Sequence, residues 1–361
     1  MRRLISRIAL GIAVLVAAVA LWARHVITTP AYHTRAGQYI KIPKGSSPVT
    51  VIKKLKSEGI IKHEWPLLLY LKLTGAGSRF KAGEYDFASP ISPFAVIAKL
   101  QHGEQRLVRL TIVEGWTRWD IAEAMAGVPE LGLQDSQTAL ALMSDVSLIR
   151  DLDLDADNLE GYLYPATYEF PPNTTPAELI GLMVEQFRSV WKPDWSARAA
   201  ALGMSARQVV TVASLIETEA KLPAERPLIA SVIYNRLKKD IPLGVDSSII
   251  YGSKIDGKWR NDGKVYRSDI ERRSPYNTRI HPGLPPGPIA SPGESSLLAA
   301  LNPAQTNYMY YVREPSRDDG AHNFYVHEKD FALGVQALRK WERERDAENA
   351  KKKSQEIHLQ H

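Results

Sequence analysis

An uncharged, apolar run near the N-terminus limits what the rest of the chain can be. It extends from Ile8 to Ala23, with Arg2, Arg3 and Arg7 before it and Arg24 directly after it. A helix needs about 17–25 apolar residues to span a bilayer, so this run is at the short end, but the flanking arginines can snorkel outward. The excess of arginines before the run predicts a cytoplasmic N-terminus and a body outside the cytoplasmic membrane.

A cleaved signal peptide is the alternative, because Ala18-Val19-Ala20 offers a small-residue cleavage site. Both alternatives export the body, and they differ only in whether it stays tethered. The run is long for the ~7–15-residue apolar region of a signal peptide, which favours the tether. We therefore predict a single-pass anchor in the inner (cytoplasmic) membrane within residues 1–24, with the body on the periplasmic or outer face.

The charge and cysteine content exclude several classes of protein. The formal charge is +6, but without the four arginines near the anchor only 42 basic residues face 40 acidic ones. The body is therefore nearly neutral and shows no basic footprint for nucleic acid. The 361 residues include no cysteine, which excludes disulfides and thiolate sites.

The sequence after the apolar run predicts an α+β fold, with a small subdomain ahead of a larger, mainly helical domain. A polar linker (25–37) precedes a region (38–127) in which a strand, a turn and a short helix recur around Gly45, Ser92-Pro93 and Gly115. An acidic connector (128–157) leads to the larger domain (158–340), and a charged tail (341–361) ends the chain. Within the larger domain, "NTRIHPGLPPGPIASPGE" is too rich in proline for a helix and predicts a long surface loop that could roof a cleft.

The stretch "MSARQVVTVASLIETEAKLPAE" predicts a buried helix that carries two glutamates. Ser205 and Gln208 form a capping box, and the following residues are apolar on nearly every face. Glu217 and Glu219 are about 200° apart on such a helix, so they cannot form one catalytic pair. A carboxyl group walled by valine and alanine is expected to have a raised pKa and to serve as a proton donor. The alternative is a structural acid paired with Arg226 or Lys221.

Several blocks of sequence closely resemble those of the endolytic murein transglycosylase (YceG-like) family. They are "VASLIETEA", "ERPLIASVIYNRL", "PLGVDSSIIYG", "SPYNTR", "GLPPGPIASPG", "LNPAQTNYMYYV" and "HNFYVHE", in order across residues 158–332. The resemblance implies that residues 38–127 form a LysM-like subdomain and that Glu217, the first glutamate of the helix motif, is the catalytic acid. Gly244, Val245 and Ser247 depart from the family pattern, which leaves the glycan contacts of that loop open.

Further polar residues are candidates for contacts with sugar, each with a structural alternative. Asn235 and Arg236 follow the apolar face of a second helix, where they either bind glycan or tie helices together. His322 lies in the "HNF" block, but His322 and His327 lack the spacing of a zinc site, and we predict no metal and no cofactor. The predicted substrate contacts are Asn235, Arg236, Asp246, Tyr276, Asn277 and His322.

The resemblance implies a lyase that cuts the MurNAc-GlcNAc bond within nascent glycan strands and leaves 1,6-anhydroMurNAc ends. In that mechanism Glu217 protonates the glycosidic oxygen and then helps to deprotonate the muramyl 6-hydroxyl, so one carboxylate suffices. Cell-wall synthases are the expected partners. Two alternatives stay open: a hydrolytic muramidase with Asp246 or Glu160 as its second carboxylate, and a glycan-binding scaffold without activity.

Overall fold

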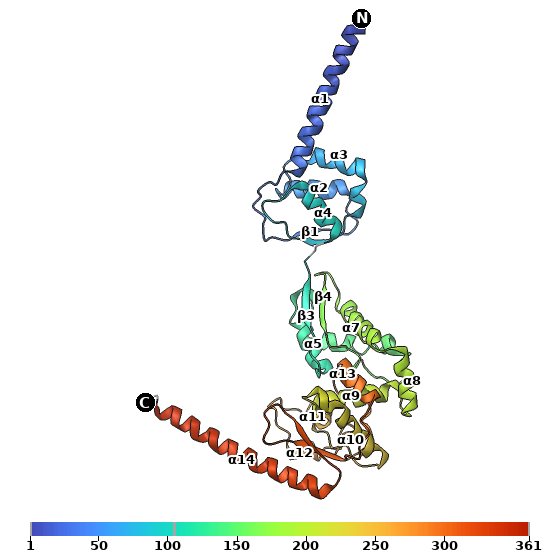
Figure 1. Ribbon diagram of the computed structural model, residues 1–361, viewed down its shortest axis with the longest axis vertical. Helices are drawn as coiled ribbons and strands as arrows, with labels where there is room; N and C mark the ends of the chain where they lie inside the picture. The colour runs from blue at the N-terminus through green and yellow to red at the C-terminus, as the bar shows by residue number, and fades with distance from the viewer. Residues whose placement is uncertain (1, 104–105, 360–361) are drawn as a thin grey trace. The chain divides into compact units, whose positions relative to one another are not determined.

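The computed structural model describes residues 2–103 and 106–359, which form two compact units (Figure 1). Unit 1 comprises Met1–Arg109 and Glu169–Asn173, and unit 2 comprises Leu110–Tyr168 and Thr174–His361. The sequence pattern predicts a subdomain boundary after residue 127, whereas the structure divides the two units after Arg109. It also returns a short segment, 169–173, to unit 1, and no local pattern in the sequence marks that return.

Unit 1 is a small α/β unit that contains the N-terminal helix. Its strands β1 and β2 pair antiparallel, with Ile40 opposite Tyr85 and Ile42 opposite Gly83. Ser92 caps the last helix of the unit by accepting a hydrogen bond from the N–H of Ala95, as the Ser-Pro pair predicted. The elements are α1 (Arg2–Thr28), β1 (Ile40–Ile42), α2 (Pro48–Ser57), α3 (Glu64–Thr74), the short η1 (Ala76–Arg79), β2 (Gly83–Tyr85) and α4 (Pro93–His102).

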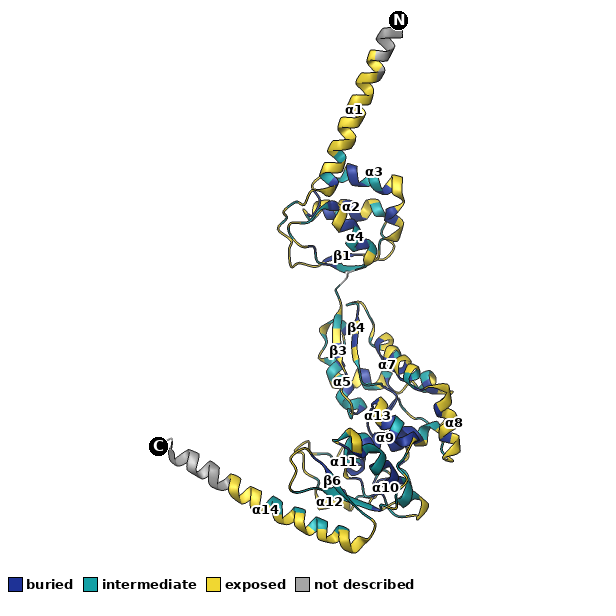
Figure 2. Ribbon diagram, viewed as in Figure 1, coloured by how far each residue is buried: buried dark blue, intermediate teal, exposed yellow. Residues whose placement is uncertain are grey.

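Helix α1 reaches further than the predicted anchor. It continues to Thr28, and Ile27 is buried in the core of unit 1. Ala31 then pairs with Ile91, so the predicted linker (25–37) begins as part of the unit. The stretch Leu10–Thr28 is long and apolar enough to cross a membrane, and it is almost fully exposed (yellow in Figure 2). It fits either an anchor or a signal sequence.

The first half of unit 2 includes the region expected to be a loose acidic connector. Residues 128–157 instead contribute Leu131, Met143 and Ile149 to the buried core, and buried Asp153 pairs with Arg207 at 2.7 Å. The elements here are β3 (Val108–Thr111) and β4 (Thr167–Phe170), which form a two-stranded sheet, with α5 (Arg118–Ala126), η2 (Pro129–Leu131), α6 (Ser136–Leu142), η3 (Val146–Ile149), α7 (Pro176–Val190) and α8 (Pro193–Ala201).

Helix α9 (Ala206–Glu219) is the buried centre of unit 2 (Figure 2). The predicted capping box is present: the N–H of Gln208 donates to Ser205 Oγ, and the N–H of Ser205 donates to Gln208 Oε1. Every residue from Val209 to Ile216 is buried, because α10 (Arg226–Lys238), α11 (Asp246–Ile255) and α13 (Glu294–Leu301) pack around the helix. The two glutamates lie in the last turn of α9, just after this buried stretch.

The remaining elements complete unit 2. Strands β5 and β6 form an antiparallel hairpin in which Tyr311 lies opposite Phe324 and Arg313 opposite His322. Helix α14 runs through the boundary predicted at residue 340. These elements are η4 (Pro223–Glu225), α12 (Arg267–Ile270), β5 (Tyr310–Arg313), β6 (His322–Tyr325) and α14 (Glu328–Leu359).

The second half of the proline-rich stretch before α13 is buried inside unit 2, so the prediction of a surface loop is wrong there. Residues 287–293 are all buried. The N–H of Ile289 donates to Ser214 Oγ on α9, and the N–H of Ser291 donates to the carbonyl of Trp116. Prolines bring no N–H that needs a partner, so such a segment can be buried at little cost in unsatisfied hydrogen bonds.

Candidate active site

The two glutamates of α9 have different surroundings, and Glu217 is held in an ion pair. Its carboxylate lies 2.9 Å from the Arg226 guanidinium, and the two side chains are only 5% and 12% exposed. The second oxygen accepts a hydrogen bond of 2.8 Å from the N–H of Gly293. Both oxygens of this carboxylate therefore make charge-assisted hydrogen bonds, one to a cation and one to a backbone donor. The structural alternative of a pair with Arg226 therefore describes Glu217.

Glu219 has neutral hydroxyl donors and no ion pair among the described residues. The Tyr311 hydroxyl donates to its carboxylate at 2.9 Å, and Ser247 provides a second hydroxyl. Burial raises the pKa of Glu219, and the negative charge of Asp246 raises it further, while the two hydroxyls and the His322 ring act in the opposite direction. The raised pKa expected of a buried carboxyl group on this helix is thus found at Glu219.

The prediction that the two carboxylates point apart is confirmed by their partners. Glu217 contacts α10 and the segment before α13, whereas Glu219 contacts β5 and the start of α11. A difference of about 200° around the helix axis produces this separation. Each carboxylate therefore belongs to its own site.

Three of the predicted contact residues gather around Glu219. Asp246 begins α11 and accepts hydrogen bonds from Nε and Nη2 of Arg279, at 2.9 and 2.7 Å. The edge of the His322 ring meets Tyr311, with centroids 5.3 Å apart. Arg236 also lies near Tyr311, where its positive charge acts on the tyrosine. Glu219 thus has an acid and a histidine close by, and Arg236 lies near its partner Tyr311.

Glu225 and Tyr311 were not among the predicted site residues. Glu225 is buried and holds His322 through its backbone N–H (2.8 Å) and its Nδ1 (2.7 Å). Burial and the neighbouring Glu219 raise the pKa of Tyr311, so this hydroxyl remains a donor. The alternation of apolar Met309 and Tyr311 in "YMYYV" was the one available signal that Tyr311 faces inward.

Asn235 and Arg236 use their donors within the protein. The Asn235 amide donates to the carbonyls of Thr306 and Tyr308, at 2.9 Å each. Arg236 donates to the carbonyls of Met309, Pro242 and Leu243 at 2.7, 3.0 and 2.7 Å, and it lies over the Tyr310 ring. Both residues therefore have the structural role that the sequence left open. They fix β5, which carries Tyr311, and the segment that leads into α11, which begins at Asp246.

The contacts of Tyr276 and Asn277 are with residues other than Glu219 and its partners. The Asn277 amide is buried and donates to the carbonyls of Ile270 and Arg272, at 2.8 Å each. Tyr276 packs on Tyr251, with ring centroids 4.9 Å apart. Tyr251 in turn hydrogen-bonds Glu160, so Tyr276 belongs to the surroundings of Glu160.

Glu160, one of the alternative second carboxylates, lies in this separate cluster. It is 3% exposed, and the backbone N–H of Arg118 donates to both of its oxygens, at 3.1 and 3.2 Å. Burial raises the pKa of Glu160 to about 7, against the opposing effects of Arg118 and Tyr251. Neither Glu219 nor its partners act on this group, so Asp246 remains the candidate second carboxylate for hydrolysis.

The pH dependence of stability is expected to report on Glu160. Its folded-state pKa of about 7 lies above the ordinary value of 4.5, so between these pH values the folded chain binds more protons and its stability falls as pH rises. Glu160→Gln keeps an oxygen for the N–H of Arg118 but carries no charge. Its free energy of unfolding is expected to exceed that of the parent by about 3 kcal/mol above pH 7 and by little below pH 4.5.

Urea unfolding of both proteins across pH 4 to 8 measures this difference. A difference that does not change with pH would mean that Glu160 titrates normally in the folded chain.

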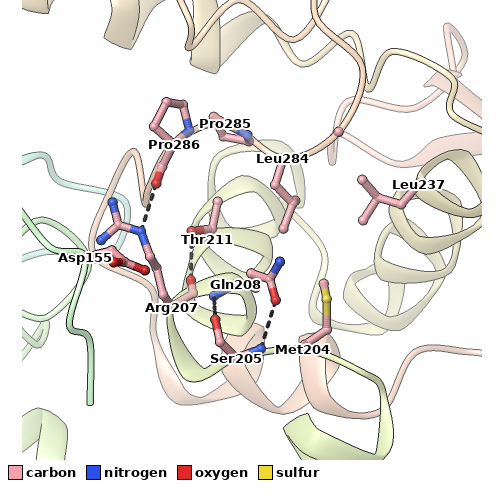
Figure 3. Close-up of a pocket in the computed structure, with 11 residues that line it drawn as sticks. Asp155, Met204, Ser205, Arg207, Gln208, Thr211, Leu237, Leu284, Pro285 and Pro286 are labelled. Atoms are coloured by element: carbon pink, nitrogen blue, oxygen red, sulfur yellow. Dashed lines mark hydrogen bonds between the residues drawn. The ribbon is translucent and has the colours of Figure 1, made fainter. Parts of the chain in front are cut away.

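A hollow of about 600 Å³ opens at the other end of α9 (Figure 3). The capping box lines it, and Arg207 spans it by donating to the carbonyl of Pro286 at 2.8 Å. Ser205 and Glu219 are separated by the whole helix, ~20 Å at 1.5 Å per residue. We place the candidate active site at Glu219, where a buried carboxylate has hydroxyl, histidine and acidic neighbours. No cluster of three or more potential metal ligands occurs within residues 2–103 and 106–359.

The chain is similar to the proteins of a known family. The model described as YceG-like family matches residues 40–337. A Bacillus subtilis (strain 168) protein named endolytic murein transglycosylase is 36% identical over 289 residues, which cover 76% of this chain and 78% of that protein. A Streptococcus pneumoniae (serotype 2) protein of the same name is 29% identical over 299 residues, covering 76% of this chain and 54% of the relative.

A solved structure agrees with these matches. The 2.6 Å crystal structure of a yceG-like protein from Listeria monocytogenes superposes with a TM-score of 0.56 at 30% sequence identity. The match covers 81% of this chain and 96% of the other.

Proposed function

The chain belongs to the YceG-like family, and from that premise we propose that it is an endolytic peptidoglycan lytic transglycosylase with Glu219 as its acid. Homologues named endolytic murein transglycosylase support the general role in peptidoglycan. The observation that carries the choice of residue is the contrast between the two carboxylates of α9. Glu217 is paired with Arg226 at 2.9 Å, whereas Glu219 has hydroxyl partners, and burial raises its pKa.

In the proposed reaction Glu219 begins protonated and transfers its proton to the oxygen of the MurNAc-GlcNAc bond. The bond from that oxygen to the anomeric carbon breaks, and positive charge develops on the muramyl ring. Asp246, which accepts two hydrogen bonds from Arg279, lies near enough to act on Glu219 electrostatically. The Tyr311 hydroxyl stabilises the carboxylate that the transfer leaves behind.

The second half of the reaction uses the same carboxylate as a base. Glu219 accepts the proton of the muramyl 6-hydroxyl while that oxygen attacks the anomeric carbon. A 1,6-anhydro ring closes, the acid is regenerated and no water is consumed. One carboxylate therefore serves as acid and base, where hydrolytic glycosidases generally use two.

Digestion of intact sacculi by the purified full-length protein tests the proposed activity. We expect fragments several disaccharides long, because an endolytic enzyme cuts inside strands. Release of disaccharides alone from strand ends would contradict endolytic cleavage. Binding without any cleavage would favour the glycan-binding scaffold.

Tyr311→Phe is expected to change the pH profile of the reaction. The Tyr311 hydrogen bond lowers the pKa of Glu219 against the effect of burial, so its loss raises that pKa further. The alkaline limb of kcat/KM, where the acid loses its proton, is then expected to move to higher pH, with a fall in rate of about tenfold. A lower rate with an unmoved alkaline limb would mean that Tyr311 does not contact the titrating acid.

We further propose that α1 anchors the protein in the inner membrane, with its N-terminus cytoplasmic and its catalytic domain on the periplasmic or outer face. The arginines before the apolar stretch support this orientation. From this position the enzyme would meet nascent strands beside cell-wall synthases. The part of the predicted LysM-like region (38–127) that lies in unit 1, residues 38–109, would serve as the LysM-like subdomain. A reporter fused to the C-terminus is expected to be active only outside the cytoplasm.

A further inference from the structure

An exposed apolar stripe on α3 lies beside the membrane helix. Trp65, Leu69 and Leu73 are spaced four residues apart and are 46%, 47% and 77% exposed. Residues four apart differ by only about 40° around a helix, so the three side chains share one face. The opposite face of α3, with Leu67 and Leu71, is buried in the core of unit 1. The stripe therefore takes no part in the buried core of unit 1.

The stripe is continuous with α1. The Trp22 ring of α1 stacks on the Trp65 ring, with centroids 5.2 Å apart and planes at 19°. Helix α1 packs against α3 in unit 1, and Figure 1 shows α3 where α1 enters the unit. Tryptophan concentrates at the membrane–water interface, so the Trp22–Trp65 pair marks the depth at which α3 begins.

The length of the apolar run gives a reason for unit 1 to approach the bilayer. The uncharged residues Ile8–Ala23 form a helix only ~24 Å long, against a hydrocarbon core of ~30 Å. A short span is accommodated by thinning the bilayer or by drawing flanking groups into the interface. Lys72 is exposed on the same side of α3, where its stem can lie along the apolar surface while its charge reaches the headgroups.

We propose that α3 lies in the membrane interface, with Trp65, Leu69 and Leu73 in contact with lipid. The helix then acts as a second, monotopic contact beside the span and holds unit 1 against the bilayer surface. This inference rests on the proposed insertion of α1. It assigns the stripe to lipid rather than to a protein partner because the stripe adjoins an apolar span.

The absence of cysteine allows a direct measurement on the full chain. Single cysteines replace Leu69, Leu73, Val14 within α1, or Lys41 on β1, all of which are exposed. Strand β1 lies at the end of unit 1 away from α1 (Figure 1), so Lys41→Cys is the matched control. Each variant receives a spin label and is reconstituted into vesicles, and its relaxation by lipid-soluble oxygen and by a water-soluble nickel chelate is compared.

The ratio of oxygen to chelate accessibility is expected to be about tenfold higher at positions 69 and 73 than at position 41, as for a ~1.4 kcal/mol preference for lipid. The label at position 14 tests the anchor separately. Lipid exposure at 14 with full chelate access at 69 and 73 would overturn the α3 proposal and leave the anchor standing. Chelate access at 14 would instead overturn the anchor. Protection of 69 and 73 from both reagents would assign the stripe to a second copy or another protein.

Discussion

Glu219→Gln is expected to abolish glycan cleavage while leaving the fold intact. Glutamine matches the shape of glutamate and still accepts the hydrogen bond from Tyr311, but it cannot deliver a proton to a leaving oxygen. Loss of general acid catalysis costs about 10²–10⁴-fold in rate. The measurement is the initial rate of fragment release from purified glycan strands, with the thermal unfolding temperature recorded for the same preparation.

Glu217→Gln is the matched control, since it removes the other carboxylate of the same helix turn. Assayed at a temperature where it is folded, this variant is expected to keep most of its rate per folded molecule. Loss of activity in folded Glu217→Gln with retention in Glu219→Gln would restore Glu217 as the acid. Equal loss in both folded variants would mean that the two carboxylates act jointly.

The second large effect is an expected loss of stability in the Glu217→Gln variant. Its substitution by glutamine leaves the guanidinium of Arg226, only 12% exposed, without its counter-charge. The Nε of Arg226 already lacks a hydrogen-bond partner among the described groups. Breaking a buried ion pair from one side costs about 3–5 kcal/mol. We expect urea unfolding of Glu217→Gln to show a loss of that order relative to the parent.

A double variant shows how much of the loss in stability comes from the unpaired charge of Arg226. Replacing both partners, as Glu217→Gln with Arg226→Met, removes the uncompensated cation and is expected to recover part of the loss. A single variant as stable as the parent would contradict a structural role for the pair.

Local sequence patterns predicted the elements on which the site is built. The capping box at Ser205 and the all-apolar run after it located α9, and the 3.6-residue period predicted that its two glutamates diverge. These features depend on residues within a few positions of one another, so a single segment determines them. The order of the sequence blocks likewise indicated the family that the comparisons support.

The choice of Glu219 as the proposed acid depends on contacts between distant segments. Gly293, which donates to Glu217, is 76 residues away in the chain, and Tyr311, which donates to Glu219, is 92 residues from its partner. Valine and alanine neighbours on the helix could suggest a buried carboxyl group but not which one meets a cation. Ser247, noted as a departure from the family pattern, contributes a hydroxyl to Glu219. Burial of the proline stretch depended in the same way on Ser214 and Trp116.

Digestion of glycan strands in heavy-oxygen water tests the central claim most directly. If Glu219 serves as both acid and base and the muramyl 6-hydroxyl is the nucleophile, the new ends are 1,6-anhydro sugars. We expect fragments without label, each lighter by one water than the product of hydrolysis, and no fragments from the Glu219→Gln variant. Incorporation of heavy oxygen at new reducing ends would contradict the account and indicate a hydrolase in which Asp246 activates water.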